Sequence, residues 1–352
     1  MKKQLILNRN EIVQGPSPKV MNVLHNFPAQ RVSMYIDAYQ DSILKKTITK
    51  QFKIKEEQII IGYGIEDLLK TIINNLSGKD ILLTHELHYT FYKKYADFRG
   101  ITIATFQLIE DNNAFSFDIE DCINKIAELS PKVILIASPN NPTGNSLSPT
   151  EAIRIIRAAD KNTLVIIDEA YWGFDINYDQ KKILQLIKQY DNVVLLRTFS
   201  KFYAMAGLRI GFALCGKQAT KMLRYQNHYL GASRILEEAA IAALRSPSYY
   251  KNLSREIIKT RDWLIAKTNN LKFFKAYNSN SYLLIVRTTP VAKKLLERKS
   301  KKMKAIIFKF VNDDLMRVSI SKKEYAQELI KVFQEIDLSL ATSSKKQKDV
   351  HQ

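Results

Sequence analysis

Short apolar runs alternate with longer amphipathic stretches over most of this chain of 352 residues. The runs have the length of β-strands, and the stretches between them carry apolar residues at helical spacing. The runs lie at residues 58–61, 80–83, 101–105, 132–137, 164–167 and 192–196. This order predicts an α/β fold with a mostly parallel central sheet and helices on both faces, because parallel strands are joined by helical crossovers.

The order of elements changes toward the C-terminus. A long helical stretch at 249–268 precedes strand-like runs at 281–286, 305–308 and 315–320 and a helix at 323–336. This pattern predicts a second, smaller α+β domain. We therefore expect a large domain at 36–245, a small domain at 246–338 and a polar, disordered tail at 339–352.

The composition is that of a globular protein, with 46% hydrophobic and 25% charged residues. The net charge of +19 comes from lysines scattered in pairs such as Lys45 and Lys46, which favours solvated surfaces over a nucleic-acid site. No apolar run approaches the length of a membrane span. The two cysteines, Cys122 and Cys215, form no metal-ligand pattern. We expect a cytoplasmic protein that binds no metal, nucleic acid or membrane.

The most informative polar segment follows the strand-like run at 192–196. Lys201 comes after two hydroxyl residues, Thr198 and Ser200, and Arg209 stands further along the same segment. A lysine amine can form an imine with an aldehyde, and an arginine can hold a phosphate. Pyridoxal phosphate is an aldehyde that carries a phosphate, so this segment indicates that cofactor.

Other polar residues follow neighbouring strands, whose carboxyl ends meet at one edge of a parallel sheet. Asp168 is the choice for the charge that keeps the pyridine nitrogen of the cofactor protonated. Glu169 is the second candidate, although strand alternation turns it to the other face. Asn141 and Tyr171 are placed to hydrogen-bond the phenolic oxygen of the cofactor.

A glycine-containing turn follows the run at 58–61 and opens a helix. The backbone N–H groups of Gly64, Ile65 and Glu66 are candidates for binding phosphate, because a helix N-terminus attracts anions. They form a phosphate cup with the hydroxyl and guanidinium groups near Lys201. The side chains of Glu66 and Asp67 are expected to point away from this cup or to interact with the helix N-terminus.

An aromatic cluster follows the run at 80–83. Tyr89 is the candidate for stacking on the pyridine ring. Tyr92 and Tyr95 are expected only to pack their helix against the sheet. His88 is interpreted as a polar loop residue.

These motifs resemble those of the class I and II aminotransferases, which have pyridoxal-phosphate fold type I. They are most similar to those of histidinol-phosphate aminotransferases and the related threonine-phosphate decarboxylases. The matching segments are Asn-Pro-Thr-Gly at 141–144, Asp-Glu-Ala-Tyr at 168–171, Thr-x-Ser-Lys at 198–201 and Ala-Gly-x-Arg-x-Gly at 206–211. The resemblance covers nearly the whole chain except the tail. It implies that Lys201 forms the Schiff base and transfers protons, while Ser200 and Arg209 hold the phosphate beside Thr198.

The resemblance also implies roles for residues outside these motifs. Arg317 corresponds to the arginine that grips the substrate carboxylate, and Asn141 also faces the substrate. Asn10 lies in a segment, residues 1–35, that resembles the part covering the active site. Tyr35 corresponds to a tyrosine that reaches the phosphate of the neighbouring subunit, which implies a homodimer with shared active sites.

Several segments depart from the family pattern, and these departures concern the substrate rather than the cofactor. The usual Gly-Ser-Asp-Glu is replaced at 64–67, Arg-Tyr-Pro at 34–36 and Ala-Asn-Phe at 279–283. The leading hypothesis is transamination between histidinol phosphate and 2-oxoglutarate. The alternatives are transamination of aromatic or other amino acids, decarboxylation of the threonine-phosphate type, and a cofactor-binding regulator that contacts DNA.

Overall fold

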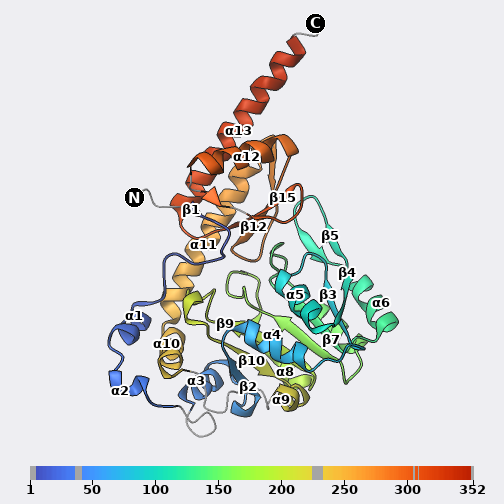
Figure 1. Cartoon of the computed structure of the whole chain (residues 1–352), viewed down its shortest axis with the longest axis vertical. Coiled ribbons are helices and arrows are strands. Elements are labelled where there is room, and N and C mark those ends of the chain that lie inside the picture. Colours follow the sequence, from blue (N-terminus) through green and yellow to red (C-terminus); the bar gives the residue numbers. More distant parts are fainter. Residues whose placement is uncertain (1–4, 36–41, 224–232, 304–305, 308, 350–352) are drawn as a thin grey trace.

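The computed structural model describes residues 5–35, 42–223, 233–303, 306–307 and 309–349. Within these residues the large sheet has seven strands in the order β2-β10-β9-β8-β7-β3-β4 (Figure 1). The strands are β2 (Ile59–Gly62), β3 (Ile81–His85), β4 (Thr102–Phe106), β7 (Val133–Ala137), β8 (Leu164–Asp168), β9 (Val193–Thr198) and β10 (Gly211–Cys215). β10 runs antiparallel to both of its neighbours, and the other pairs are parallel. The predicted α/β fold with a mostly parallel sheet is confirmed.

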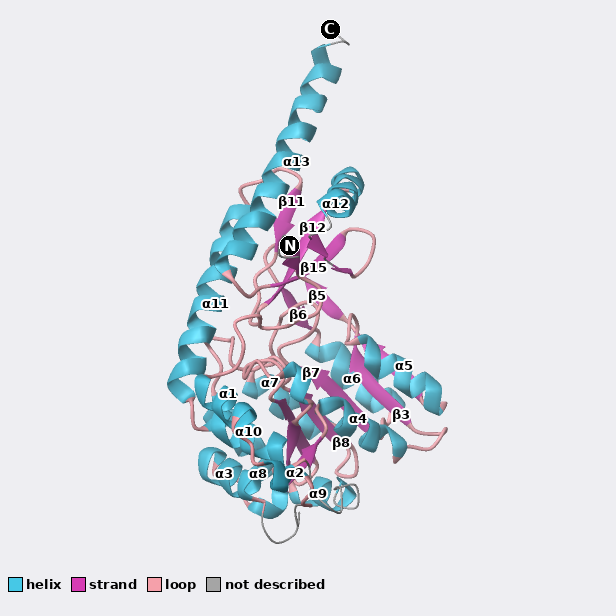
Figure 2. Ribbon diagram, turned by 60° about the vertical axis from the view of Figure 1, so that its left-hand side comes forward, coloured by secondary structure: helices cyan, strands magenta, loops and turns pink. Residues whose placement is uncertain are grey.

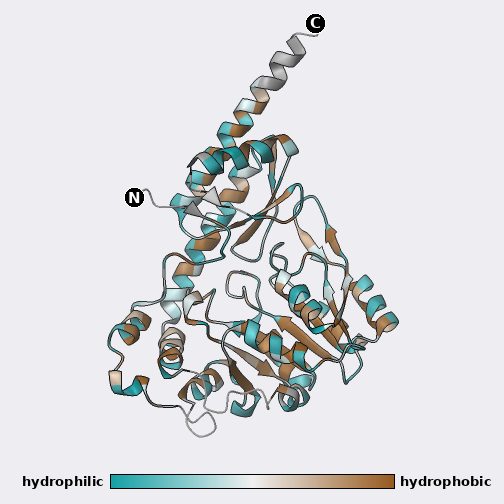
Figure 3. Cartoon of the chain, viewed as in Figure 1, coloured by the Kyte–Doolittle hydropathy of each residue, from teal (hydrophilic) through white to brown (hydrophobic). Residues whose placement is uncertain are grey.

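Helices cover both faces of this sheet (Figure 2). The helices α4 (Ile65–Asn74), α5 (Thr90–Arg99) and α9 (Lys217–Leu223) pack on one face, and α6 (Ile119–Leu129), α7 (Pro149–Ala158) and α8 (Gln180–Gln189) pack on the other. In β8, Leu164 and Ile166 face α4 and α5, whereas Val165 and Ile167 face the opposite layer. Both faces are therefore buried at the centre of the sheet, which explains why β7 and most of β8 and β9 are apolar (Figure 3).

Local sequence signals set several helix ends. α7 begins with a capping box, in which Ser148 and Glu151 each accept a hydrogen bond from the backbone of the other. Pro149 occupies the first turn, where no backbone N–H is needed. α5 ends at Gly100, whose φ of 66° is the left-handed conformation that closes helices.

The smaller sheet has the order β11-β12-β15-β14. Its strands are β11 (Phe274–Ala276), β12 (Leu283–Thr288), β14 (Lys309–Phe310) and β15 (Leu315–Ser319). The helices around it are α11 (Pro247–Thr268), α12 (Pro290–Met303) and α13 (Lys323–Asp349). The N-terminal strand β1 (Leu5–Ile6) pairs in parallel with β13 (Ile306–Ile307), so the start of the chain lies against this second sheet (Figure 1).

The predicted disordered tail is wrong for residues 339–349. These residues continue α13, which projects beyond the second sheet (Figure 1). The stretch after Ile336 contains neither glycine nor proline, so the sequence has no strong signal that would stop the helix. Adding a residue to an existing helix avoids the cost of nucleation.

Further helices were not anticipated by the apolar periodicity. They are α1 (Pro18–His25), α2 (Ala29–Val32), α3 (Ile43–Phe52) and α10 (Arg234–Leu244), together with α6, α9 and α12. α10 contacts α1, α2 and α3, which places the N-terminal helices beside the large sheet.

Among the described residues, no helix is long and apolar enough to cross a membrane, and no group of His, Cys, Asp and Glu side chains could hold a metal. Cys122 and Cys215 are buried free thiols.

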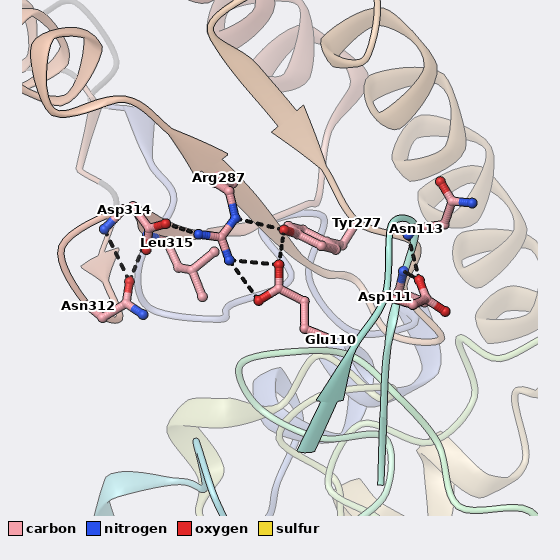
Figure 4. Close-up of polar contacts among 9 residues, drawn as sticks. Glu110, Asp111, Asn113, Tyr277, Arg287, Asn312, Asp314 and Leu315 are labelled. Atoms are coloured by element: carbon pink, nitrogen blue, oxygen red, sulfur yellow. Dashed lines mark hydrogen bonds and ion pairs between the residues drawn. The ribbon is translucent and has the colours of Figure 1, made fainter. Parts of the chain in front are cut away.

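A charged cluster joins the second sheet to the hairpin formed by β5 (Leu108–Glu110) and β6 (Phe115–Phe117). Arg287 on β12 donates two hydrogen bonds of 2.7 Å to the carboxylate of Glu110 (Figure 4). The hydroxyl of Tyr277 also donates to Glu110, and Asp314 pairs with Arg287 from the other side. Because β12 pairs directly with β15, this cluster also links β15 to the hairpin that follows β4.

A second charged pair is buried on the face of the large sheet that α6, α7 and α8 cover. Arg197 is fully buried, and its Nε donates to Glu169 at 2.7 Å. The guanidinium lies 4.9 Å from the ring centroid of Phe52 and 4.6 Å from that of Trp172. Glu169 therefore neutralises a buried arginine. Its side chain lies on the opposite face of the sheet from that of Asp168, as strand alternation predicts.

The Glu169→Gln substitution is expected to lower the free energy of unfolding by about 3 kcal/mol, because it leaves the buried Arg197 without its counter-charge. Urea unfolding followed by tryptophan fluorescence measures this loss, since Trp172 packs on the guanidinium. The control is Asp97→Asn, which breaks the exposed pair between Lys93 and Asp97 and should cost less than about 1 kcal/mol. Equal losses in the two variants would contradict this interpretation.

Candidate active site

One cavity lies beyond the carboxyl ends of β7, β8 and β9. Its volume is about 310 Å³, within the range of small-molecule sites. The predicted residues that line it are Asn10, Ile65, Glu66, Tyr89, Asn141, Asp168, Tyr171, Thr198, Ser200, Lys201, Arg209 and Arg317. They come from segments far apart in the sequence, and the parallel strand ends bring most of them together.

Lys201 lies in the turn between β9 and β10. Its Nζ donates to the backbone oxygen of Asn10 at 3.0 Å and lies 5.8 Å from the ring centroid of Tyr171. Burial lowers the pKa of Lys201 to about 8, and the positive charges of Arg209 and Arg317 contribute to the shift. A substantial fraction of this amine is therefore neutral and nucleophilic near neutral pH.

The hydroxyl of Tyr171 is the centre of a hydrogen-bond network. The side-chain amides of Asn10 and Asn141 donate to it at 2.9 and 3.1 Å. Arg317 donates from Nη1 to Asn141 Oδ1 at 2.8 Å and from Nη2 to the backbone oxygen of Asn8 at 2.6 Å. The Nε of Arg317 is buried and has no hydrogen-bond partner among the described residues, so this guanidinium retains a donor for a ligand.

Asp168, the last residue of β8, carries a buried carboxylate. Its Oδ1 accepts from the backbone N–H of Ala170 at 3.0 Å, and its Oδ2 accepts from the hydroxyl of Tyr92 at 2.6 Å. Burial raises the pKa of Asp168 to about 6, and these two hydrogen bonds oppose the rise. The expectation that Tyr92 only packs against the sheet is wrong, because its hydroxyl contacts this carboxylate.

The segment at 64–66 and Arg209 lie side by side. Gly64 precedes α4 with a φ of 78°, and a Cβ there would lie 2.9 Å from Arg209 Nη2. Arg209 Nη1 donates to Ser200 Oγ at 3.4 Å, and Ser200 is held by Thr198 through two hydrogen bonds. The first N–H groups of α4 have no partners within the helix and therefore remain able to bind an anion.

Glu66 does not follow the expectation for its side chain. Its Oε1 accepts from the hydroxyl of Tyr89 at 2.8 Å, and its Oε2 lies 3.7 Å from Arg209 Nη2. Asp67 does interact with the helix start, because its carboxylate accepts from the backbone N–H of Tyr63. Glu66 therefore fixes the hydroxyl end of Tyr89 at the edge of the phosphate cup.

Two predicted residues do not line the cavity. Gly64 lies behind it, against Arg209. Tyr35 is 76% exposed, and its described contact is the hydrogen bond from Arg234 to its backbone oxygen. Its neighbour Ile36, which belongs to the same departure from the family pattern, lies outside the described residues.

The loop at 141–144 meets the segment at 279–283. A Cβ at Gly144 would lie 2.0 Å from Ser279 Oγ, and its φ of 76° favours glycine as well. The backbone N–H of Asn280 donates to the oxygen of Gly144 at 2.7 Å. The segment at 279–283, which differs from the family pattern, therefore packs against the loop that carries Asn141.

The family model described as aminotransferase class I and II matches residues 2–333 of this chain. The chain belongs to this family. It is 31% identical over 331 residues to the histidinol-phosphate aminotransferase of Clostridium botulinum, covering 92% of this chain and 89% of that protein. It is a pyridoxal-phosphate-dependent aminotransferase, which confirms the predicted enzyme class and cofactor.

Solved structures share the fold of this aminotransferase. The pyridoxal-phosphate complex of histidinol-phosphate aminotransferase from Sinorhizobium meliloti superposes with a TM-score of 0.83, at 23% identity and over 96% of this chain and 92% of that one. L-threonine-O-3-phosphate decarboxylase from Porphyromonas gingivalis superposes with a TM-score of 0.77, at 17% identity and over 94% of this chain and 98% of that one. The fold is thus common to transferases and a lyase.

The lowered pKa of Lys201 predicts how the cofactor-free aminotransferase reacts with pyridoxal phosphate. The rate should rise with pH up to about 8 and then level off, because the neutral amine is the nucleophile. Stopped-flow absorbance of the cofactor measures this rate, and N-acetyl-lysine amide, whose amine has an unperturbed pKa of about 10.4, serves as the control. A rate that continues to rise beyond about pH 9 would contradict the lowered pKa.

Proposed function

We propose that this aminotransferase moves the amino group of histidinol phosphate to 2-oxoglutarate. The observation that carries the proposal is the 31% identity to a histidinol-phosphate aminotransferase over nearly the full length of both chains. The cavity supports it, because Arg317 and Lys309 both line its wall and provide positive charge for a phosphorylated substrate. We also propose a cytoplasmic location, which suits the two free thiols, Cys122 and Cys215.

The residues around the cavity fit pyridoxal phosphate. The cofactor supplies an aldehyde for amines and a ring that withdraws electrons from them. Asp168 would pair with the ring nitrogen, and Tyr89 would stack on the ring. Asn141 and Tyr171 would hold the phenolic oxygen. The buried, unpartnered Nε of Arg317 leaves a donor for the substrate.

The phosphate cup would hold the other end of the cofactor. Its donors are the backbone N–H groups of Ile65 and Glu66, the hydroxyl of Ser200 and the guanidinium of Arg209. Gly64 permits the close approach of Arg209 that shapes the cup, because any side chain there would meet the guanidinium.

Lys201 would perform the proton transfers. A primary amine with a pKa of about 8 would accept the proton that leaves the substrate α-carbon and, once protonated, would serve as the acid that gives it back. The hydrogen bonds among Asn10, Asn141 and Tyr171 would keep the groups around Nζ in place during these transfers. The hydrogen bond from Nζ to Asn10 ties the N-terminal segment to the site.

We propose that the active enzyme is a homodimer in which Tyr35 reaches the phosphate cup of the second subunit. Tyr35 is 76% exposed, and Val32 and Met34 beside it are 73% and 57% exposed. Apolar side chains gathered on one exposed segment favour a protein contact over solvent.

The Lys201→Ala substitution is expected to abolish the visible absorption of the bound cofactor and to lower turnover by at least about a thousandfold, because it removes both the nucleophile and the proton carrier. Absorbance spectra and a transamination assay measure these effects. The control is Lys267→Ala, which removes an exposed lysine of α11 and should leave both unchanged. Full activity in the Lys201 variant would refute the assignment.

A panel of amino donors tests the substrate. Histidinol phosphate with 2-oxoglutarate is expected to give glutamate with the highest kcat/KM among histidinol phosphate, aromatic amino acids and threonine phosphate, because its phosphate can pair with the cationic wall of the cavity. Release of carbon dioxide from threonine phosphate would instead support the decarboxylase alternative. Preferred turnover of an aromatic amino acid would refute histidinol phosphate as the substrate and leave the aminotransferase class intact.

A further inference from the structure

We propose that Tyr92 is a positioning residue for Asp168, whose hydroxyl keeps the carboxylate ionised and oriented toward the ring nitrogen of the cofactor. This inference rests on the proposed role of Asp168 as the partner of that nitrogen. It adds a residue that sequence reasoning assigned only to packing. The hydrogen bond of 2.6 Å from Tyr92 Oη to Asp168 Oδ2 is the observation that carries it.

The position of Tyr92 is strongly constrained. The side chain is fully buried in the layer between α5 and the sheet. Its ring is stacked on His88 with a centroid distance of 5.8 Å, and the ring of Tyr89 meets it edge-on at 5.8 Å. Held on two sides, the ring directs its hydroxyl at one point, which is the carboxylate of Asp168.

The hydrogen bond has a fixed direction. Burial raises the pKa of Tyr92 far above its ordinary value, so the hydroxyl keeps its proton at every relevant pH and donates it to the carboxylate. The other oxygen of Asp168 accepts from the backbone N–H of Ala170 at 3.0 Å. The carboxylate is therefore held at both oxygens, and each oxygen retains a second lone pair.

Ionisation of Asp168 is the property that the cofactor requires. A protonated acid would no longer hold a positive charge on the ring nitrogen, and the ring would lose its capacity to accept electrons. Burial alone favours the protonated acid, and the hydrogen bonds from Tyr92 and Ala170 oppose it. Loss of one hydrogen bond to a charged group corresponds to a rise of about one to two pKa units.

Other titratable groups near Asp168 do not replace this hydrogen bond. They are Glu169 and Tyr171 on its own segment, Tyr89 just before α5, Glu66 on α4, Lys201 and Arg209 beyond β9, Arg317 on β15, His85 at the end of β3, and His88, whose ring stacks on Tyr92 and whose pKa is lowered by burial. Burial lowers the pKa of His85 to about 4, so this ring is neutral above about pH 5. Glu169 raises the pKa of Asp168 further, and Tyr92 is the side chain that donates to the carboxylate.

The Tyr92→Phe substitution removes the hydroxyl and keeps the ring. In protein loaded with ¹⁵N-labelled pyridoxal phosphate, the nitrogen signal at neutral pH should move toward that of the unprotonated ring. The matched control is Tyr277→Phe, which removes a hydroxyl that donates to a different carboxylate, that of Glu110 (Figure 4), and neither residue lines the cavity. The control should keep the wild-type nitrogen signal.

The cofactor-free protein provides a second readout. The pKa of Asp168 lies above its unfolded value, so its contribution to stability is present at low pH and is lost as pH rises through about 6. In Tyr92→Phe the pKa of Asp168 should be higher, so its contribution to stability should continue to fall at pH values above about 6. The difference in melting temperature between wild type and Tyr92→Phe should therefore grow from about pH 5 to about pH 8, unlike that of Tyr277→Phe.

The outcomes separate this inference from the proposed function. A wild-type nitrogen signal together with a pH-independent stability loss in Tyr92→Phe would show that Tyr92 only fills the core, and would overturn the inference. A wild-type protein that gives no bound cofactor signal would instead refute the proposed site.

Discussion

The alternation of side chains at the end of β8 is the constraint on which the site depends. β8 lies between β7 and β9 with both faces covered, so consecutive residues must enter opposite layers. Asp168 enters the layer of α4 and α5 and meets Tyr92. Glu169 enters the other layer and pairs with Arg197. A shift of one residue in the β8 register would exchange the two carboxylates and would leave Arg197 buried without a counter-charge.

The large sheet alone does not complete the cavity. Arg317 comes from β15 of the second sheet and Asn10 comes from the N-terminal segment, and both contact residues of the large-sheet layer. The cluster of Arg287 and Glu110 links the second sheet, to which β15 belongs, to the hairpin that follows β4 (Figure 4). The substrate side of the cavity is thus built where several separate segments meet.

Much of the site could be predicted from the sequence because its residues follow strands. Lys201, Asp168 and Asn141 each come after an apolar run, and parallel strands place their carboxyl ends together. The contacts of Tyr92 and Glu66 could not be predicted in this way, because both lie on helices. The spacing of Tyr89 and Tyr92 is also that of a helix packing on a sheet, so it carries no signal for the carboxylate. The polar composition of residues 339–349 predicts disorder, but the stretch has no glycine or proline to stop α13, and the helix continues through it.

The sequence by itself determined the α/β architecture, the family and the cofactor. Apolar runs of strand length and contiguous motifs are local properties of the sequence, so they can be recognised without knowing how the elements pack. Only the tertiary structure decided which groups touch. It turned Glu66 toward Tyr89, placed the hydroxyl of Tyr92 on Asp168 and brought Arg317 to Asn141. Those contacts join residues distant along the chain, and their geometry depends on packing of helices and sheets that no local pattern encodes.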